Sequence, residues 1–444
     1  MKEKMRFAVS GSNVHLLHRP APTLAAFLRA GHTSHHKLES LLAANRLPFR
    51  RLVFDAAYLH GQNELLTAVA GAGCEVVLDL NVAETAALGR FGSAVAKLPW
   101  GNADRPWTPA DFAAGRNDDF WKRMAEFVVQ SGVHTVLAPT HAFGDAEWLE
   151  VDRNSCVHLR NELDRAGAAN VAIDHVVIVG TRELRDAARR HAMVDAISDL
   201  PIQNVWLRVG GFGATATGVG TRHVIEAARF LHDIGRPLVI DMAGGFAALA
   251  GLAFGAVGGI SHGVAQRESF DLAAWRKPPP ARKGGGTQSR TYVAELDRYL
   301  DADQAKAFFA VRGTKARFGC ADARCCRNGI EDMTENAHAH FLVQRHRQVE
   351  ALAAVPEARR AEHFLLHHLD PALRSVRQAA KLKFGDESVQ KVVGDAKGRL
   401  ARLRDALGAL HEADAGCASR SRAPSFRGGL ERAGPGAVMR GNVS

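Results

Sequence analysis

Polar side chains recur directly after short apolar runs in the first 270 residues, where they could perform acid–base or nucleophilic chemistry. They are Asp55, Asp79, Asn81, His141, Arg208, Asp241 and His262. Carboxylates, imidazoles and a guanidinium brought together can provide a nucleophile, a general base and an anion holder. We expect Asp55, Asp79 and Asp241 to be catalytic and the other four to bind substrate. The alternative for any single Asp is a cap on the following helix.

Glycine pairs mark two of the same turns. Gly210 and Gly211 follow one apolar run, and Gly244 and Gly245 follow another. Glycine lets backbone N–H groups approach an anion closely, as in the phosphate sites of barrel enzymes. We expect these four residues to contact a flat or phosphorylated substrate. The alternative is tight packing at the end of a barrel.

A third group of residues has the chemistry of a metal site. Cys320, Cys325 and Cys326 lie within seven residues, and His338, His340 and His346 follow. Thiolates and imidazoles are the usual ligands of tetrahedral Zn²⁺. On a helix the three histidines point in different directions, and His340 is the preferred fourth ligand. This predicts a structural Zn²⁺ held by Cys320, Cys325, Cys326 and His340, and the alternative is a set of reduced, unliganded cysteines.

The elements that must position these residues alternate between strands and helices. Seven short apolar runs are separated by Gly or polar turns and by Ala/Leu/Arg-rich stretches with helical spacing. The runs are Arg51–Asp55, Glu75–Leu80, Thr135–Ala138, His175–Val179, Asn204–Val209, Pro237–Asp241 and Ala256–Ile260. Phe7–Val9 or Val14–Leu17 could supply an eighth strand. Such a series predicts a (β/α)8 TIM-type barrel, with a doubly wound sheet as the alternative.

The composition divides the chain into three parts. Residues 1–275 form the predicted barrel, and 276–413 form a mostly helical extension with the candidate zinc site. Residues 414–444 have the composition of a disordered tail. Inside the barrel, residues 97–118 carry two Trp and three Pro and could form a lid or a substrate wall, or simply cap one end.

The net charge of +10 is concentrated in the second half. Residues 271–444 hold 30 Lys and Arg against 20 Asp and Glu, whereas residues 1–270 hold 27 of each. A basic extension on a neutral barrel suggests nucleic acid as partner, although a solvated basic surface would look the same. The sequence has no apolar run of 18 residues and no apolar core near its start. We therefore expect a soluble, cytoplasmic protein with no membrane partner.

This order of parts resembles the tRNA-guanine transglycosylase family, whose barrel carries a Cys-rich zinc site closed by a His. Cys320, Cys325, Cys326 and His340-Phe341-Leu342 stand where that site would be. Phe54-Asp55-Ala56-Ala57-Tyr58, followed by Gly61-Gln62, is similar to the turn that carries an Asp at the family's base pocket. Leu207-Arg208-Val209-Gly210-Gly211 is similar to its base-contacting Gly-Gly turn. The family's nucleophilic Asp has no counterpart, because Gly259-Ile260-Ser261-His262-Gly263 stands in its place.

The resemblance implies a divergent enzyme that exchanges a nucleobase in tRNA or DNA by N-glycosyl transfer. Asp241 or Asp79 would attack or stabilise the ribosyl carbon, and Asp55 would move a proton or hold the base. The substrates would be nucleic acid and a free nucleobase, and the enzyme could be a homodimer. Two alternatives are a flavin- or phosphosugar-binding barrel enzyme and a catalytically inactive, nucleic-acid-binding barrel.

Overall fold

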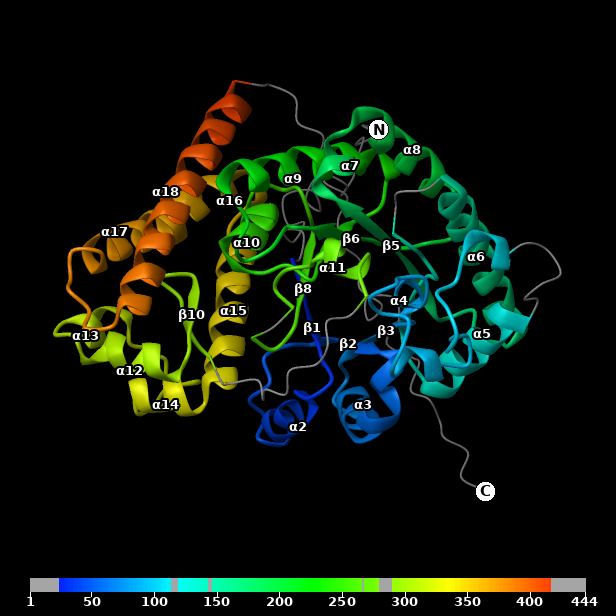
Figure 1. Cartoon of the computed structure of the whole chain (residues 1–444), viewed down its shortest axis with the longest axis horizontal. Coiled ribbons are helices and arrows are strands. Elements are labelled where there is room, and N and C mark those ends of the chain that lie inside the picture. Colours follow the sequence, from blue (N-terminus) through cyan, green and yellow to red (C-terminus); the bar gives the residue numbers. More distant parts are fainter. Residues whose placement is uncertain (1–23, 113–118, 143–145, 266, 279–289, 417–444) are drawn as a thin grey trace, which may run out of the picture.

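Eight parallel strands close into a barrel in the computed structural model of this chain (Figure 1). The structure describes residues 24–112, 119–142, 146–265, 267–278 and 290–416. The strands are β1 (Ala25–Arg29), β2 (Arg51–Asp55), β3 (Glu75–Asp79), β4 (Thr135–Leu137), β5 (Ala172–Gly180), β6 (Val205–Gly210), β7 (Leu238–Asp241) and β8 (Gly259–His262). Strand β1 pairs with both β2 and β8, so the predicted (β/α)8 fold is confirmed.

Helices surround the barrel and alternate with its strands. They are α2 (His35–Ala43), α3 (Asn63–Gly71), α4 (Val82–Thr85), α5 (Asp119–Ser131), α6 (Ala146–Arg165), α7 (Thr181–Arg185), α8 (Ala187–Ile197), α9 (Gly218–Phe230), α10 (Gly245–Ala253) and α11 (Leu272–Trp275). Four 3₁₀ turns lie between them: η1 (Ala56–Gln62), η2 (Val95–Lys97), η3 (Pro109–Phe112) and η4 (Leu231–Ile234). Polar caps set several starts, as at α9, where the Thr217 hydroxyl accepts a hydrogen bond from the Gly220 N–H.

The sequence located six of the eight strands closely and placed two wrongly. Strand β8 begins at Gly259, three residues later than predicted. The first strand is Ala25–Arg29, which the sequence pattern did not indicate. The segments proposed for it, Phe7–Val9 and Val14–Leu17, lie outside the described residues.

The extension folds as a hairpin and a set of helices on one side of the barrel (Figure 1). Its elements are β9 (Thr291–Val293), β10 (Arg298–Leu300), α12 (Ala302–Ala310), α13 (Thr314–Phe318), α14 (Ile330–Glu335), α15 (Ala337–Ala353), α16 (Glu357–His363), the π-helical turn η5 (Phe364–Leu369), α17 (Asp370–Ala379) and α18 (Glu387–Ala415). Helix α18 packs on α9, while α15 and α16 pack on α10. Helix α18 includes positions 414 and 415 of the predicted tail, and the rest of that tail from 417 lies outside the described residues.

One hydrophobic core joins the barrel's helix layer to the extension. Leu249 of α10 and Leu342 of α15 belong to the same buried cluster. A second, smaller cluster fills the barrel interior and includes Phe27, Val176 and Trp206. Within the described residues, none of the helices combines the length and the apolar character needed to cross a membrane.

Candidate active site at the C-terminal end of the barrel

Side-chain alternation along the strands brings the three predicted catalytic carboxylates together inside the barrel mouth. Asp55, Asp79 and Asp241 are each the last residue of their strand. Two residues earlier, Val53, Val77 and Val239 belong to the interior cluster, and side chains at a spacing of two point to the same face. The structure therefore places all three carboxylates in one layer, as the sequence predicted.

Two buried arginines occupy the centre of this layer. Arg29 Nη1 lies 3.0 Å from an Asp55 oxygen, and its Nη2 lies 3.0 Å from Asp79 Oδ2. Arg29 also binds both oxygens of Asp241, at 2.9 and 2.7 Å. Arg208 Nη2 lies 2.9 Å from Asp79 Oδ2 and 2.7 Å from Asp241 Oδ2. The predicted Arg208 is thus a counter-ion of the carboxylates, and Arg29, which the sequence did not single out, shares that role.

Asp241 is enclosed by this network. Its side chain is fully buried, and both oxygens accept hydrogen bonds from the arginines. Burial alone would raise its pKa, but Arg29 and Arg208 outweigh burial and hold the pKa of Asp241 well below its ordinary value. This carboxylate is a permanent anion that orders two cations and does not line the cavity above them.

A cavity of about 320 Å³ opens above the layer and is lined by polar and apolar groups. Its polar residues are Asp55, Asn81, Glu84, Arg90, Arg267, Ser269 and Asp271, so one predicted catalytic residue and one predicted binding residue line it. Its apolar walls include Tyr58, Met242, Phe270 and Trp275. An apolar pocket with a few converging polar groups is the usual form of a small-molecule site.

Glu84 is the residue of this cavity that sequence reasoning missed. It lies on α4, is 5% exposed, and accepts a hydrogen bond from the Asn81 amide at 3.3 Å. Its second oxygen has no hydrogen-bond partner among the described residues. Burial and the nearby Asp79 raise the pKa of Glu84. The spacing Asp79-x-Asn81-x-x-Glu84 is the signal that could have found it, since all three follow the same strand.

Asp55 has the opposite electrostatic environment. Burial raises its pKa, but Arg267 and Arg29 outweigh burial, and the net effect lowers the pKa of Asp55. Arg267 binds the second Asp55 oxygen, so each oxygen of this carboxylate has a cationic partner. The two carboxyl groups are therefore shifted in opposite directions, with the pKa of Asp55 lowered and the pKa of Glu84 raised. Two carboxyl groups with pKa values pushed apart can divide the roles of ionic stabiliser and proton donor.

His141 lies away from the cavity. Its Nδ1 is 2.6 Å from an Asp152 oxygen, and its ring stacks on Trp148 with centroids 3.7 Å apart. Phe112, from the described part of the 97–118 insertion, packs against the same ring. No described residue of that insertion lines the cavity, so the predicted substrate wall is not formed by this part.

His262, predicted to bind substrate, lies in the core and does not line the cavity. Because β8 starts at Gly259, Ser261 is in register with the inward-facing Phe27, and His262 is in register with Leu28 of the outer layer. The His262 ring is fully buried between Phe49 and Phe341. Burial lowers its pKa to about 4, so the ring is a neutral part of the core.

At the turn of Gly244 and Gly245, carboxylates of the protein lie where a substrate phosphate was expected. A side chain at Gly244 would collide with the Glu268 carboxylate, and the Phe246 N–H at the start of α10 donates to Asp297 at 2.9 Å. Gly245 has φ +65°, and its N–H faces Glu268. Two carboxylates of the protein thus occupy the place predicted for a phosphate.

Gly210 and Gly211 accommodate the chain that returns over the barrel mouth after β8. A Cβ at Gly210 would lie 2.7 Å from Leu272 Cβ. The Gly211 N–H donates to the Phe270 carbonyl at 2.8 Å, and this residue has φ +78°. These two glycines let the return segment pack closely, and neither lines the cavity beside Asp55.

The extension fixes the return segment that carries Arg267 and Phe270. Glu268 accepts from Arg345 Nη2 at 2.9 Å and from the Tyr299 hydroxyl at 2.6 Å. Arg345 is fully buried on α15. Because Arg267 pairs with Asp55, this contact connects the extension to the cavity.

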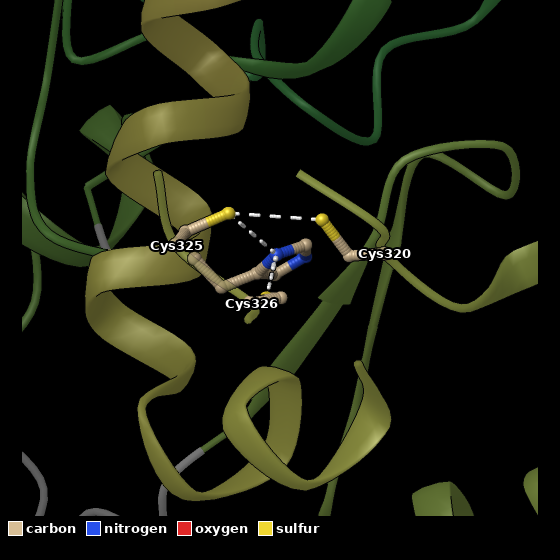
Figure 2. A group of neighbouring side chains, drawn as sticks. Cys320, Cys325 and Cys326 are labelled. Carbon is tan, nitrogen blue, oxygen red and sulfur yellow. Dashed lines mark hydrogen bonds between the residues drawn. The ribbon is translucent and has the colours of Figure 1, made fainter. Parts of the chain in front are cut away.

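The four predicted metal ligands come together within the extension, where the loop after α13 meets the start of α15. The Cys320 and Cys325 sulfurs are 3.6 Å apart, and His340 Nδ1 lies 3.8 Å from the Cys325 sulfur and 3.3 Å from the Cys326 sulfur. Figure 2 shows the three cysteine side chains converging on one point. These separations fit the edges of a tetrahedron around an ion with metal–sulfur bonds of about 2.3 Å. The cluster can hold a metal ion.

Neighbouring groups orient these ligands. The His340 Nε2–H donates to the Tyr292 carbonyl at 2.9 Å, which leaves Nδ1 as the ligand atom. The Gln344 amide donates to the sulfurs of Cys320 and Cys325 at 3.4 and 3.5 Å. Such donors stabilise thiolates. His338 and His346 are not part of the cluster within the described residues.

Comparisons with known proteins give structural neighbours of low similarity. No protein-family model and no curated protein matches the chain. Among solved structures, a GH26 beta-mannanase from Bacteroides ovatus is 11% identical, with a TM-score of 0.37, over 61% of this chain and 87% of its own. The endo-1,4-beta-xylanase XylE from Penicillium canescens is also 11% identical, with a TM-score of 0.32, over 56% and 84%. Similarity at this level carries no argument about chemistry.

Proposed function

We propose that this chain is a divergent tRNA-guanine transglycosylase-like enzyme that transfers an N-glycosyl group between nucleobases in nucleic acid. The observation that carries the proposal is the pairing of Asp55 and Glu84 in one cavity with opposite pKa shifts. Breaking an N-glycosidic bond needs an anion near the developing ribosyl cation and a proton for the leaving base. The two carboxyl groups supply these two functions.

The exchange can be written with Glu84 as the only proton carrier. The bond between C1′ and the base nitrogen breaks, and the leaving base takes the Glu84 proton while Asp55 stabilises the ribosyl cation. The incoming base then returns a proton to Glu84 as its nitrogen attacks C1′. Asn81 donates to Glu84 and so holds the carboxyl in place. Tyr58, Phe270 and Trp275 supply faces suitable for a planar base.

This assignment changes the roles expected from the sequence. Asp241 and Asp79 do not line the cavity, and both hold the arginines Arg29 and Arg208. We assign them a positioning role. The flavin and phosphosugar alternative loses its main support, because Glu268 and Asp297 lie at the glycine turn of α10.

The extension supplies the electrostatic attraction for a polyanion. Seven cations on the α17–α18 hairpin are exposed and make no ion pair within the described residues. They are Arg374, Arg377, Lys381, Lys383, Lys391, Lys397 and Arg402. Contacts of this kind bind phosphates without reading sequence. Zn²⁺ is the proposed ion at Cys320, Cys325, Cys326 and His340, where it would tie the extension together.

The test is incorporation of a labelled base. The protein is incubated with mixed tRNA, or with DNA, and radiolabelled guanine, adenine or a deazapurine, and the polymer is recovered and counted. We expect time-dependent incorporation that falls at least 100-fold in Glu84→Gln and in Asp55→Asn. Glu64→Gln, an exposed carboxylate of α3, is the control. Salt-dependent binding of the polymer without incorporation of any base would favour the inactive-barrel alternative.

A further inference from the structure

A π-helical turn interrupts the helices of the extension. Turn η5 lies between α16 and α17, and the Asp370 N–H donates to the Leu365 carbonyl five residues earlier. Such turns contain one more residue than an α-helical turn and are rare, and they are frequently found at functional sites. This one contains or adjoins three of the chain's 21 histidines.

The wider turn brings three imidazoles to one side. The His363 and His367 ring centroids are 4.6 Å apart, and those of His363 and His368 are 5.6 Å apart. In an α-helix a residue five positions along is rotated by about 140°, so His368 would point away from His363. The π-helical turn returns it to the same side as His367. The local backbone therefore creates a three-histidine cluster that regular helix geometry would not.

These imidazoles are free to bind a ligand. None of the three rings makes a hydrogen bond or ion pair within the described chain. His367 is exposed, whereas the His368 ring is half-buried and stacks on Phe364. Burial and the neighbouring imidazoles lower the pKa of His363, and they lower the pKa of His368 to about 4. Neutral imidazole is the form that coordinates a metal.

We propose that His363, His367 and His368 form a second metal site, which takes a borderline divalent transition-metal ion such as Zn²⁺, Ni²⁺ or Cu²⁺. Imidazole ligands suit these ions, whereas Mg²⁺ and Ca²⁺ require oxygen ligands. As placed, the ligand nitrogens of the three rings are not all within 4.8 Å of one another, so the exposed His367 side chain must turn to complete the ligand set. With three neutral ligands, of which His367 is exposed, the site leaves coordination positions open to water. This site is separate from the Cys320 cluster and does not rest on the proposed transglycosylase function.

The test is a Ni²⁺ titration of the full-length protein, loaded first with one equivalent of Zn²⁺ and freed of excess metal. Isothermal titration calorimetry should show about one further equivalent of Ni²⁺. We expect the double variant His363→Gln/His367→Gln to bind Ni²⁺ at least 10-fold more weakly, while its Zn²⁺ content stays at that of wild type. His36→Gln removes an exposed imidazole elsewhere and should leave the titration unchanged.

A thermal melt gives an independent measure. Without added metal the double variant should unfold at the wild-type temperature, and Ni²⁺ should raise the unfolding temperature of wild type alone. If wild type binds no further Ni²⁺, the proposal is wrong. It is equally wrong if the double variant binds Ni²⁺ as tightly as wild type does.

Discussion

The barrel mouth and the helical extension use charge in opposite ways. In the mouth, Arg29 and Arg208 are buried against three aspartates, and each of these five groups has a partner of opposite charge. On the α17–α18 hairpin, Arg374, Arg377, Lys381, Lys383, Lys391, Lys397 and Arg402 are exposed and unpaired within the described residues. Buried, compensated charges hold groups in position, whereas exposed, uncompensated charges attract a distant polyanion. Under the proposed function, the buried charges belong to the catalytic region and the exposed charges to the region that binds nucleic acid.

The largest effect is expected at the centre of the mouth. Arg29→Met leaves Asp55, Asp79 and Asp241 without their shared cation, and uncompensated buried charge typically costs about 3–5 kcal/mol. Urea denaturation should show this loss of stability. Arg222→Met breaks an exposed pair with Glu226 and should cost less than about 1 kcal/mol. Equal losses of stability in the two variants would show that the buried network does not stabilise the fold.

The second prediction concerns the metal cluster. Cys326→Ser, or removal of metal by a chelator, should destabilise the protein by about 3 kcal/mol or more, because a structural ion contributes directly to folding. Metal content and thermal unfolding measure this. Cys156→Ser alters a buried thiol far from the cluster and should leave metal content unchanged. A wild-type protein that carries no metal and unfolds identically in chelator would contradict the assignment.

The third prediction uses the junction between the two regions. His262 has a folded-state pKa near 4, below the usual 6.5 of an unfolded histidine, so the unfolded chain binds more protons between these values. Stability should therefore fall as the pH drops from about 6.5 to about 4. His262→Phe, which places a third aromatic ring between Phe49 and Phe341, should reduce this slope. An unchanged slope would show that folding does not lower the pKa of His262.

The fourth prediction tests the contact from the extension to the cavity. Tyr299→Phe removes one hydrogen bond to Glu268, and the expected loss of stability is about 1 kcal/mol. Because Glu268 adjoins Arg267, the fluorescence of Trp275 in the cavity wall should also change. Arg345→Lys keeps the charge but loses the fixed guanidinium geometry and should give a larger change in fluorescence. If the fluorescence changes in neither variant, the extension does not influence the cavity through Glu268.

The smallest effect on stability, with a clear effect on binding, is expected on the α17–α18 hairpin. Lys381→Ser/Lys383→Ser should leave the unfolding temperature unchanged and weaken nucleic-acid binding at all sequences. For duplex DNA, the slope of log affinity against log salt should fall by about 1.8. Anisotropy titrations at several salt concentrations measure this. Wild-type affinity and slope in the double variant would place the nucleic acid elsewhere.

Much of the barrel could be predicted because parallel strands that are buried on both faces have continuously apolar sequences. Strand β1 was missed because Ala25–Arg29 begins with two alanines and lacks β-branched residues, and Arg29 was missed with it. The sequence ended the last strand at Ile260 and so placed His262 in the loop beyond it, whereas β8 runs to His262 and this side chain faces the outer layer. The local sequence pattern therefore indicates the position of β1 and the exact end of β8 only weakly.

The candidate site also contains residues that could be predicted from the sequence and residues that could not. The cluster of Cys320, Cys325, Cys326 and His340 could be predicted from residue type, since few side chains suit a metal such as zinc. Arg267 and Glu268 could not, because their positions depend on bridges between distant segments, such as Gly213 with Ser269. The enclosure of Asp241 likewise depends on Arg29, which is 212 residues away in sequence.

The most direct test of the central claim is mass spectrometry of the nucleosides in tRNA and DNA incubated with the protein and a heavy-isotope nucleobase. The account predicts a nucleoside whose mass shows the heavy base joined to the original sugar, formed by wild type and lost in Glu84→Gln. An unchanged nucleoside profile with both polymers and every base tried, from protein that is folded and metal-loaded, would contradict it.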